Sequence, residues 1–128
     1  MGMPAAKQGD QITASDMHMI QPPGTAPPVL TPLSFAGLID GGLSTNVNIM
    51  GKPAATQNST ATNTPPHVPI GGTLVNPPSN QGTIITGSSL VNINGKPAAR
   101  NGDTAKTCND PADLPVGTVV AAGTVNFG

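Results

Sequence analysis

Short runs in which apolar and polar residues alternate recur along the chain, and several of them end at a glycine. In the clearest of them, Val91, Asn92, Ile93 and Asn94 precede Gly95. A period of two puts successive side chains on opposite faces, which is the pattern of a half-buried β-strand. Three longer segments combine such runs with a central glycine, as β-hairpins do: 37–51, 81–95 and 116–128. We therefore expect an all-β fold of short strands and hairpins.

Proline-rich stretches separate the predicted strands. The longest, residues 21–32, contains five prolines. A proline cannot donate to the hydrogen-bond ladder of a sheet, so this stretch cannot be a central strand. We expect a surface loop with polyproline character there, and a second loop around residues 71–80.

The chain repeats one sequence unit three times. The phrase Gly-Lys-Pro-Ala-Ala follows a strand-like run at 51–55 and again at 95–99, and Gly-Met-Pro-Ala-Ala opens the chain at 2–6. The units span about 2–51, 51–95 and 95–128, and the chain ends on the run that precedes this phrase in the other copies. The first unit begins, and the last unit ends, at the same place in the repeat. This predicts a threefold ring that is closed by pairing of the two chain ends, with the termini close together. Such closure removes exposed sheet edges.

Length and composition favour one folded β domain. A chain of 128 residues can bury one core but not two. It has no Trp, Tyr or Glu, and only Phe35 and Phe127 are aromatic. Gly 16 and Pro 15 approach the composition of disordered chains, but a net charge of −1 gives no self-repulsion to hold the chain open.

Several function classes are disfavoured by the same composition. The five basic residues are scattered and form no stripe for nucleic acid. No run approaches the roughly 18 apolar residues of a membrane span, and the N-terminus has no secretory signal. The single cysteine cannot close an internal disulfide. We expect synthesis in the cytoplasm, with any later export by another route.

Each unit runs into a residue that can bind a metal. His18 lies 14 residues after Pro4, His67 lies 14 after Pro53, and Cys108 lies 11 after Pro97. If rotation relates the units, these three residues converge near the axis. Two imidazoles and a thiolate suit a single structural Zn²⁺, which prefers these ligands in a tetrahedron. The spacing resembles no classical zinc finger, so the prediction rests on repetition.

The fourth ligand stays open. Asp16 is close to His18 and is chemically suitable, while Thr107, Asn109 and Asp110 flank Cys108 and are alternatives, as is a water molecule. Met17 and Met19 point to the face opposite His18 if this segment is extended, and we expect them to pack in the core.

The repeated phrases resemble the PAAR repeat, named for Pro-Ala-Ala-Arg. The four letters stand complete at 97–100, while Lys7 and Thr56 replace the arginine in the other copies. The resemblance covers essentially the whole chain. It implies a small cone of three pseudo-threefold β-hairpin units with Pro/Gly-rich loops, and a zinc ion near the apex held by His and Cys. Carried onto this sequence, the matching positions are His18, His67 and Cys108.

The resemblance also implies a function. PAAR proteins cap and sharpen the trimeric β-helical spike, of the VgrG type, of contractile injection machines such as type VI secretion systems, extracellular contractile systems and phage tails. The partners implied are this spike, effector cargo and, transiently, the target membrane, with no nucleic acid. The particle would be delivered outside the cell or into the target. We expect no fused effector domain, since the chain begins with the first unit and ends with the third.

Two departures from the family pattern concern the second unit. Many members supply a further His or Cys there, and this unit has none. Residues 57–59, Gln-Asn-Ser, replace the usual Gly-Asp turn, so we expect this turn to differ.

An enzyme is the alternative to a structural tip. Two His and one Cys with an open fourth position occur in zinc hydrolases and deaminases. Such sites need a general base, usually Glu, which the chain lacks, although Asp16 or Asp110 could substitute. A nucleophilic pair of Cys108 and His67 is a third reading, but it has no local signature and uses the same residues as the metal site.

Overall fold

The computed structural model describes residues 2–69 and 71–127, and every regular element within them is a β-strand. The predicted all-β fold is confirmed. Gly128, at the end of the third predicted segment, lies outside the described residues. None of the described residues forms a helix that could cross a membrane. In chain order the strands are β1 (Met3–Pro4), β2 (Gln11–Gln21), β3 (Val29–Gly41), β4 (Asn48–Ile49), β5 (Lys52–Pro53), β6 (Thr60–Asn63), β7 (Thr73–Leu74), β8 (Gln81–Ile84), β9 (Asn92–Ile93), β10 (Lys96–Pro97), β11 (Thr104–Thr107), β12 (Leu114–Val120) and β13 (Asn126–Phe127).

Six strands close into a barrel. Their order around it is β12, β11, β8, β6, β3 and β2, and β12 pairs with β2 to complete the ring. Neighbouring strands are antiparallel throughout. The short β7 adds to the far end of β2, outside the ring. A closed barrel has no open sheet edge. This matters because charged side chains, which prevent edges from pairing with other chains, are few in this sequence.

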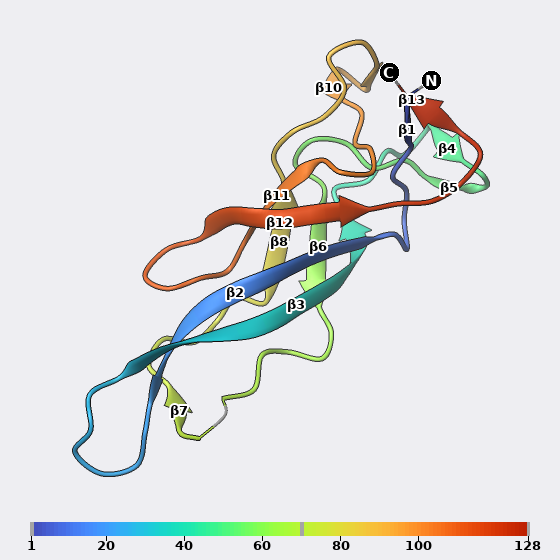
Figure 1. Cartoon of the computed structure of the whole chain (residues 1–128). Helices are drawn as coiled ribbons and strands as arrows, with labels where there is room; N and C mark the ends of the chain where they lie inside the picture. The colour runs from blue at the N-terminus through green and yellow to red at the C-terminus, as the bar shows by residue number, and fades with distance from the viewer. Residues whose placement is uncertain (1, 70, 128) are drawn as a thin grey trace.

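The β2–β3 hairpin is the longest element and projects well beyond the barrel (Figure 1). Its register runs from Gln11 opposite Leu38 to Ile20 opposite Val29. The predicted loop at 21–32 is therefore wrong over its second part, because β3 already begins at Val29 and includes Pro32. β6 pairs with β3 only from Gly37 onward, so among the described strands Pro32 has a neighbour on one side only. A proline is tolerated at such a free edge.

The barrel core is built around Phe35. Ile12, Ile39, Ile84 and Val119 surround it from β2, β3, β8 and β12, and all five side chains are at most 2% exposed. Each fully buried side chain of this size contributes roughly 1.5–3 kcal/mol. Aliphatic residues around one phenylalanine thus supply the core of a chain that lacks Trp and Tyr.

Three two-stranded ladders lie together at the end of the molecule opposite the tip of the β2–β3 hairpin, which we call the base (Figure 1). They are β4–β5, β9–β10 and β1–β13. The first two close through turns with positive φ at both central residues, 52° and 81° at Met50 and Gly51, and 54° and 80° at Asn94 and Gly95. The third joins the two chain ends, with Met3 opposite Phe127. The prediction that the termini lie close together is confirmed.

The pairing expected inside the three sequence segments is wrong. The first strand of each segment is β3, β8 or β12, and these join the barrel. The second strand is β4, β9 or β13, and it pairs with the Lys-Pro or Met-Pro of the next repeated phrase. Glycine therefore marks the place where the chain leaves the barrel for the base.

Backbone hydrogen bonds join the three repeated phrases in a ring. The amide of Ala6 donates to the carbonyl of Ala99 at 3.0 Å, that of Ala99 to Ala55 at 3.1 Å, and that of Ala55 to Ala6 at 3.1 Å. These alanines are 0% exposed. A second ring runs from residues 8, 57 and 101 to the prolines of the neighbouring phrases. The base is therefore arranged with approximate threefold symmetry, and its crowded axis explains why alanine recurs there.

The turn after each phrase has the same geometry in all three units. Asp10 and Asp103 accept the amide hydrogens of residues 7 and 100 at 3.0 and 2.6 Å. In the second unit Ser59 Oγ accepts that of Thr56 at 2.9 Å. Asn58 takes φ of 79° where Gly9 and Gly102 take 90° and 89°. The expectation that this turn differs is wrong, because Asn tolerates the left-handed region and Ser replaces the accepting carboxylate.

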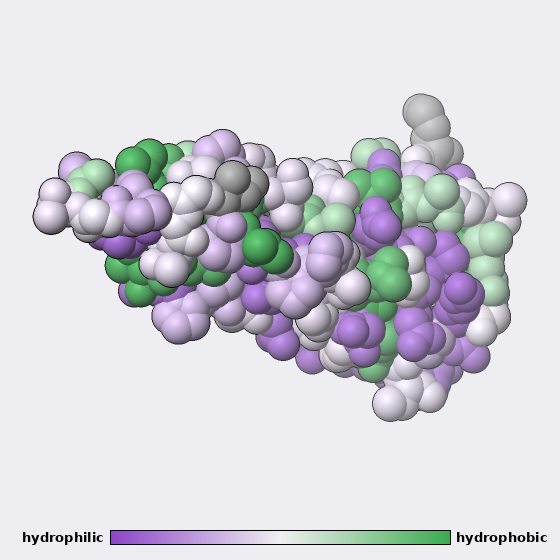
Figure 2. Space-filling model, turned by 90° about the horizontal axis from the view of Figure 1, so that it is seen from below, coloured by the Kyte–Doolittle hydropathy of each residue, from purple (hydrophilic) through white to green (hydrophobic). Residues whose placement is uncertain are grey.

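The molecule tapers away from the base (Figure 2). Its broad end carries the three ladders and its narrow end carries the projecting β2–β3 hairpin. On the face shown, apolar residues form small separate patches among polar ones. A small β cone describes this shape.

Candidate metal centre

The candidate metal centre consists of Asp16, His18, His67 and Cys108. One ligand atom of each side chain lies within 4.8 Å of those of the other three. Their exposed fractions are 0, 1, 8 and 2%. The structure thus brings together the three residues that repetition singled out, and it adds Asp16, which the sequence left among several alternatives.

Strand β2 supplies Asp16 and His18. Residues two apart in a strand share a face, and these two alternate with Met17 and Met19 on the opposite one. Both methionines are half-buried and neither belongs to the hydrophobic core, so the expectation that they pack there is wrong. The inward face of β2 therefore carries the apolar Ile12 near the base and the polar side chains of Asp16 and His18 farther along the strand.

The segment after β11 holds Cys108 against β2. The amide of Met17 donates to Asn109 Oδ1 at 2.6 Å, and the amide of Asp110 donates to the carbonyl of Met17 at 2.8 Å. The amide of Met19 donates to Asp110 Oδ2 at 2.7 Å. The side chains of Asn109 and Asp110 thus take the place of the carbonyl groups that a neighbouring strand would offer to β2. They hold Cys108 beside His18.

His67 lies in the segment that follows β6, and two asparagines position it. Its amide donates to Asn80 Oδ1 at 2.8 Å, and its Nδ1 lies 3.3 Å from Asn63 Nδ2. Asn63 Nδ2 also lies 3.2 Å from Asn80 Oδ1, and Asn63 Oδ1 accepts the amide of Ala36 at 3.0 Å. The loop that carries His67 is therefore anchored to β3 and to the residue before β8.

Asp16 is the centre of the polar contacts. Its Oδ1 accepts hydrogen bonds from the Thr107 hydroxyl and from Asn109 Nδ2. Its Oδ2 lies 2.8 Å from His67 Nε2 and 3.5 Å from the Cys108 thiol. One oxygen is held by neutral donors, and the other is left facing the imidazole and the sulfur.

Neither ring nitrogen of His18 has a hydrogen-bond partner among the residues that the structure describes, although both are buried. Asp110 Oδ2 lies 3.5 Å from its Nδ1, beyond the usual range of a hydrogen bond. Its ring centroid lies 4.8 Å from that of His67. A buried nitrogen without a partner costs about 1–3 kcal/mol. A bound metal ion would satisfy it.

Burial raises the pKa of the Cys108 thiol to about 11, and the negative charge of Asp16 acts in the same direction. A backbone hydrogen bond from Asn80 opposes this effect. Without a cation the sulfur is therefore a thiol at neutral pH. A metal ion reverses this, because its charge favours the thiolate.

The charges of the centre also fit a divalent ion. Within the described part of the chain, no lysine or arginine forms an ion pair with Asp16. A buried carboxylate needs a compensating charge. One carboxylate, one thiolate and two neutral imidazoles balance a charge of +2, and all four are known zinc ligands. The donor set therefore fits the expected ion.

A sequence model of the PAAR motif matches residues 25–104, and a second match covers 74–127. Together the matches include most of the chain. The chain belongs to the PAAR-motif family. A search of curated proteins finds no match.

The PAAR phrases and the metal centre occupy different parts of the molecule. The phrases form the hydrogen-bonded rings at the base, where Arg100 pairs with Asp103 at 2.9 Å and Lys7 pairs with Asp10 at 3.2 Å. The centre lies farther along β2, toward the narrow end (Figure 1). The residues that identify the family therefore build the base.

Some functional contacts of the centre left no mark in the sequence. Asn63 and Asn80 position His67, yet they are 17 residues apart and follow no repeat phase. Thr107 and Asn109, which the sequence offers as alternative ligands, instead donate hydrogen bonds to Asp16 Oδ1. Only the three-dimensional packing distinguishes a ligand from the residue that orients it.

Proposed function

We propose that this PAAR protein is the metal-stabilised tip of the trimeric β-helical spike of a contractile injection apparatus. The family is one of structural spike tips, and membership in it carries the proposal. The taper from a broad base to a narrow end supports the same role. A tip that caps the spike sharpens it for piercing a membrane.

The base supplies the surface that fits a trimer. Its three ladders and its ring of alanine hydrogen bonds repeat around one approximate threefold axis. A trimeric spike ends in a surface of true threefold symmetry. One chain with three similar faces can contact the three subunits in similar ways, so we infer one tip per trimer.

The proposed ion is one structural Zn²⁺, held by His18, His67, Cys108 and, as the fourth ligand, Asp16. Zinc supplies a cross-link that requires no hydrophobic core. These residues come from β2, from the segment after β6 and from the segment after β11. The ion would therefore join three parts of the chain where the cone is too narrow to bury much apolar surface.

The complete ligand set favours a structural ion over a zinc hydrolase. A catalytic zinc keeps one position for water, whereas the four side chains here would supply all four ligands of a tetrahedral ion. A hydrolase would also need a base beside that water. Asp16 is a ligand in this proposal and is therefore not free to act as that base.

We further propose that the protein is made in the cytoplasm, joins the particle through the spike, and travels with it out of the cell or into the target. Effector cargo would be a further, non-covalent partner. The metal in this setting limits unfolding during transit, because it binds the folded form alone.

The metal assignment is tested by elemental analysis of the purified chain beside single variants. We expect about one zinc per chain, and strongly reduced zinc in His18→Ala, Cys108→Ser and Asp16→Asn, as the loss of a ligand predicts. Asp40→Asn, an exposed carboxylate on β3, is the control and should keep its zinc. A wild-type chain without stoichiometric transition metal contradicts the assignment.

The spike role is tested by co-purification with a trimeric β-helical spike protein encoded beside this chain. Met50 at the base and Val29 near the narrow end are each 53% exposed. Met50→Asp should weaken binding, while Val29→Asp should not. Equal binding by both variants would contradict docking through the base, and failure of the wild-type chain to bind any such spike would contradict the role.

A further inference from the structure

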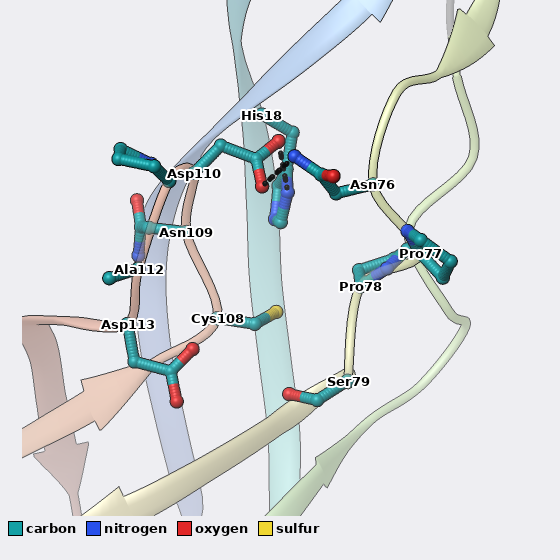
Figure 3. Close-up of a pocket in the computed structure, with 11 residues that line it drawn as sticks. His18, Asn76, Pro77, Pro78, Ser79, Cys108, Asn109, Asp110, Ala112 and Asp113 are labelled. Carbon is teal, nitrogen blue, oxygen red and sulfur yellow. Dashed lines mark hydrogen bonds and ion pairs between the residues drawn. The ribbon is translucent and has the colours of Figure 1, made fainter.

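Two hollows approach the candidate metal centre from different sides. The polar hollow, of about 270 Å³, lies between residues 76–79 and 109–113. Figure 3 shows these two segments facing each other, with the side chains of His18 and Cys108 between them. The apolar hollow, of about 420 Å³, lies between β3 and residues 63–68 and reaches His67. Each hollow therefore touches different ligands of the same centre.

The polar hollow is lined by groups that a hydrated cation can use. Asp110 and Asp113 contribute carboxylates, and Asn76 and Ser79 stand opposite them (Figure 3). Asp110 Oδ1 lies 3.4 Å from Asn76 Nδ2, and its Oδ2 lies 3.5 Å from His18 Nδ1. Carboxylate, amide and hydroxyl oxygens can replace water molecules around an ion.

The apolar hollow offers a cation much less. Its walls include Leu33, Pro65, Pro66 and Val68. An ion that moved along them would lose its water before it met a new ligand, and removing water from an ion without replacement is very costly. Its larger volume therefore does not make it the easier path.

His18 indicates which hollow leads to the centre. Its side chain is 1% exposed, both ring nitrogens lack a hydrogen-bond partner within residues 2–69 and 71–127, and it lines the polar hollow. The Cys108 sulfur points into the same space (Figure 3). A hollow of this volume has room for several water molecules, and so for a partly hydrated ion.

We propose that the polar hollow is the route by which a divalent metal ion enters and leaves the centre, with Asp110 and Asp113 as transient ligands. This inference rests on the metal centre described under the proposed function. Asp113 is exposed and meets the hydrated ion first. Asp110 is buried beside His18 and receives the ion as it loses water. His18 and Cys108 then bind it.

The route is tested with one substitution made on each side. Ser79 and Ser34 are both exposed, and they line the polar and the apolar hollow respectively. Ser79→Phe should slow zinc loading of the metal-free chain and zinc removal by a chromogenic chelator, each by about tenfold, because the ring narrows the path. The zinc dissociation constant should change little, since both rates fall together. Ser34→Phe should leave both rates as in the wild-type chain.

The role of charge is tested separately. Asp113→Asn should slow zinc loading by roughly two- to threefold at low ionic strength, and the difference should shrink in salt, because exposed charges are screened. Asp40→Asn is the control, since it also removes an exposed carboxylate, one that lies on β3. An unchanged loading rate in Asp113→Asn would remove Asp113 from the route.

The outcomes separate this inference from the proposed function. If the wild-type chain binds no zinc, the metal centre itself is wrong. If it binds one zinc, but Ser79→Phe exchanges it at the wild-type rate or Ser34→Phe slows exchange instead, the route is wrong. Should Ser79→Phe fail to fold, Ala112→Phe narrows the same hollow from its other wall and decides the question by the same rates.

Discussion

At the residue scale, the chemistry of the candidate metal centre depends on how burial changes the protonation of Cys108. The environment that suits a zinc thiolate raises the thiol pKa to about 11 when no cation is near. Metal binding therefore has to displace a proton, and apparent affinity rises with pH. The same shift makes the stability of the metal-free chain depend on pH.

We expect the metal-free protein to lose stability between about pH 9 and about pH 11. The folded-state pKa of Cys108 is raised from 9.0 to about 11, so its contribution is full below the unfolded value and is lost as pH rises through the folded value. Denaturant midpoints measured across this range check the sign. In Cys108→Ser this part of the decline should vanish, and an identical decline in both chains would contradict the assignment.

Thr107 should matter through Asp16. Thr107→Val keeps the shape of the side chain but removes the hydroxyl that donates to Asp16 Oδ1. A buried carboxylate that loses one donor should destabilise the chain by about 1–3 kcal/mol, and zinc affinity should fall by roughly tenfold, as for other lost contacts behind a ligand. Urea unfolding and zinc competition measure the two effects. Thr118→Val, at an exposed position of β12, should change neither.

The sequence predicted three of the four clustered residues because repetition singled them out. His18, His67 and Cys108 end successive units, so each supports the assignment of the others. Asp16 has no such support, because the residues two positions before His67 and Cys108 are Pro65 and Lys106. A ligand that occurs in one unit only is visible in the fold but not in the repeat.

At the element scale, the turns show how one backbone shape is reached with different residues. The carboxylate of Asp10 or Asp103 and the hydroxyl of Ser59 accept the same amide hydrogen in their units. Ser59 also donates to the carbonyl of Gly42 at 2.9 Å, which a carboxylate could not do. The second unit therefore departs from the repeat in sequence while it keeps the repeat in structure.

Asn58 allows a clean test of that equivalence. It is exposed, and its φ of 79° lies in the left-handed region. Asn58→Gly should leave stability unchanged or raise it slightly, whereas Asn58→Ala should cost about 1 kcal/mol, because a Cβ is strained there and alanine lacks the local polar contacts of Asn. Chemical unfolding should rank the three chains by stability, with Asn58→Gly at least as stable as the wild-type chain and Asn58→Ala the least stable. Gly102→Ala in the third unit is the positive control, and an alanine as stable as asparagine would contradict the equivalence.

The strand pattern was predicted better than the pairing. Alternation identified the extended segments, but a period of two does not say which strand lies alongside. Segments such as 81–95 therefore suggested local hairpins, whereas β8 pairs with β6 and β11 in the barrel. The loop predicted around Pro32 was wrong for a related reason. A proline excludes a central strand, but β6 is short and leaves this part of β3 with a free edge, where a proline is tolerated.

At the scale of the whole molecule, the two ends are stabilised by different means. The base depends on backbone hydrogen bonds among the repeated phrases and on buried alanines. Between the base and the centre lies the core around Phe35. The centre itself depends on a few polar side chains, and the ring nitrogens of one of them, His18, have no hydrogen-bond partner in the described part of the chain. The narrow end should therefore depend on metal far more than the base does.

Hydrogen exchange with and without a chelator should reveal this difference. We expect the amides of Met17 and Met19 to lose protection when zinc is removed, because their acceptors Asn109 and Asp110 directly follow Cys108, which the proposed ion would hold in place. The amides of Ala6, Ala55 and Ala99 should stay protected, since their ring lies at the base and contains no ligand. Local opening of this kind is measured residue by residue. Loss of protection at both ends together would mean that the cone unfolds as one unit, and that the metal supports the whole barrel and not the narrow end alone.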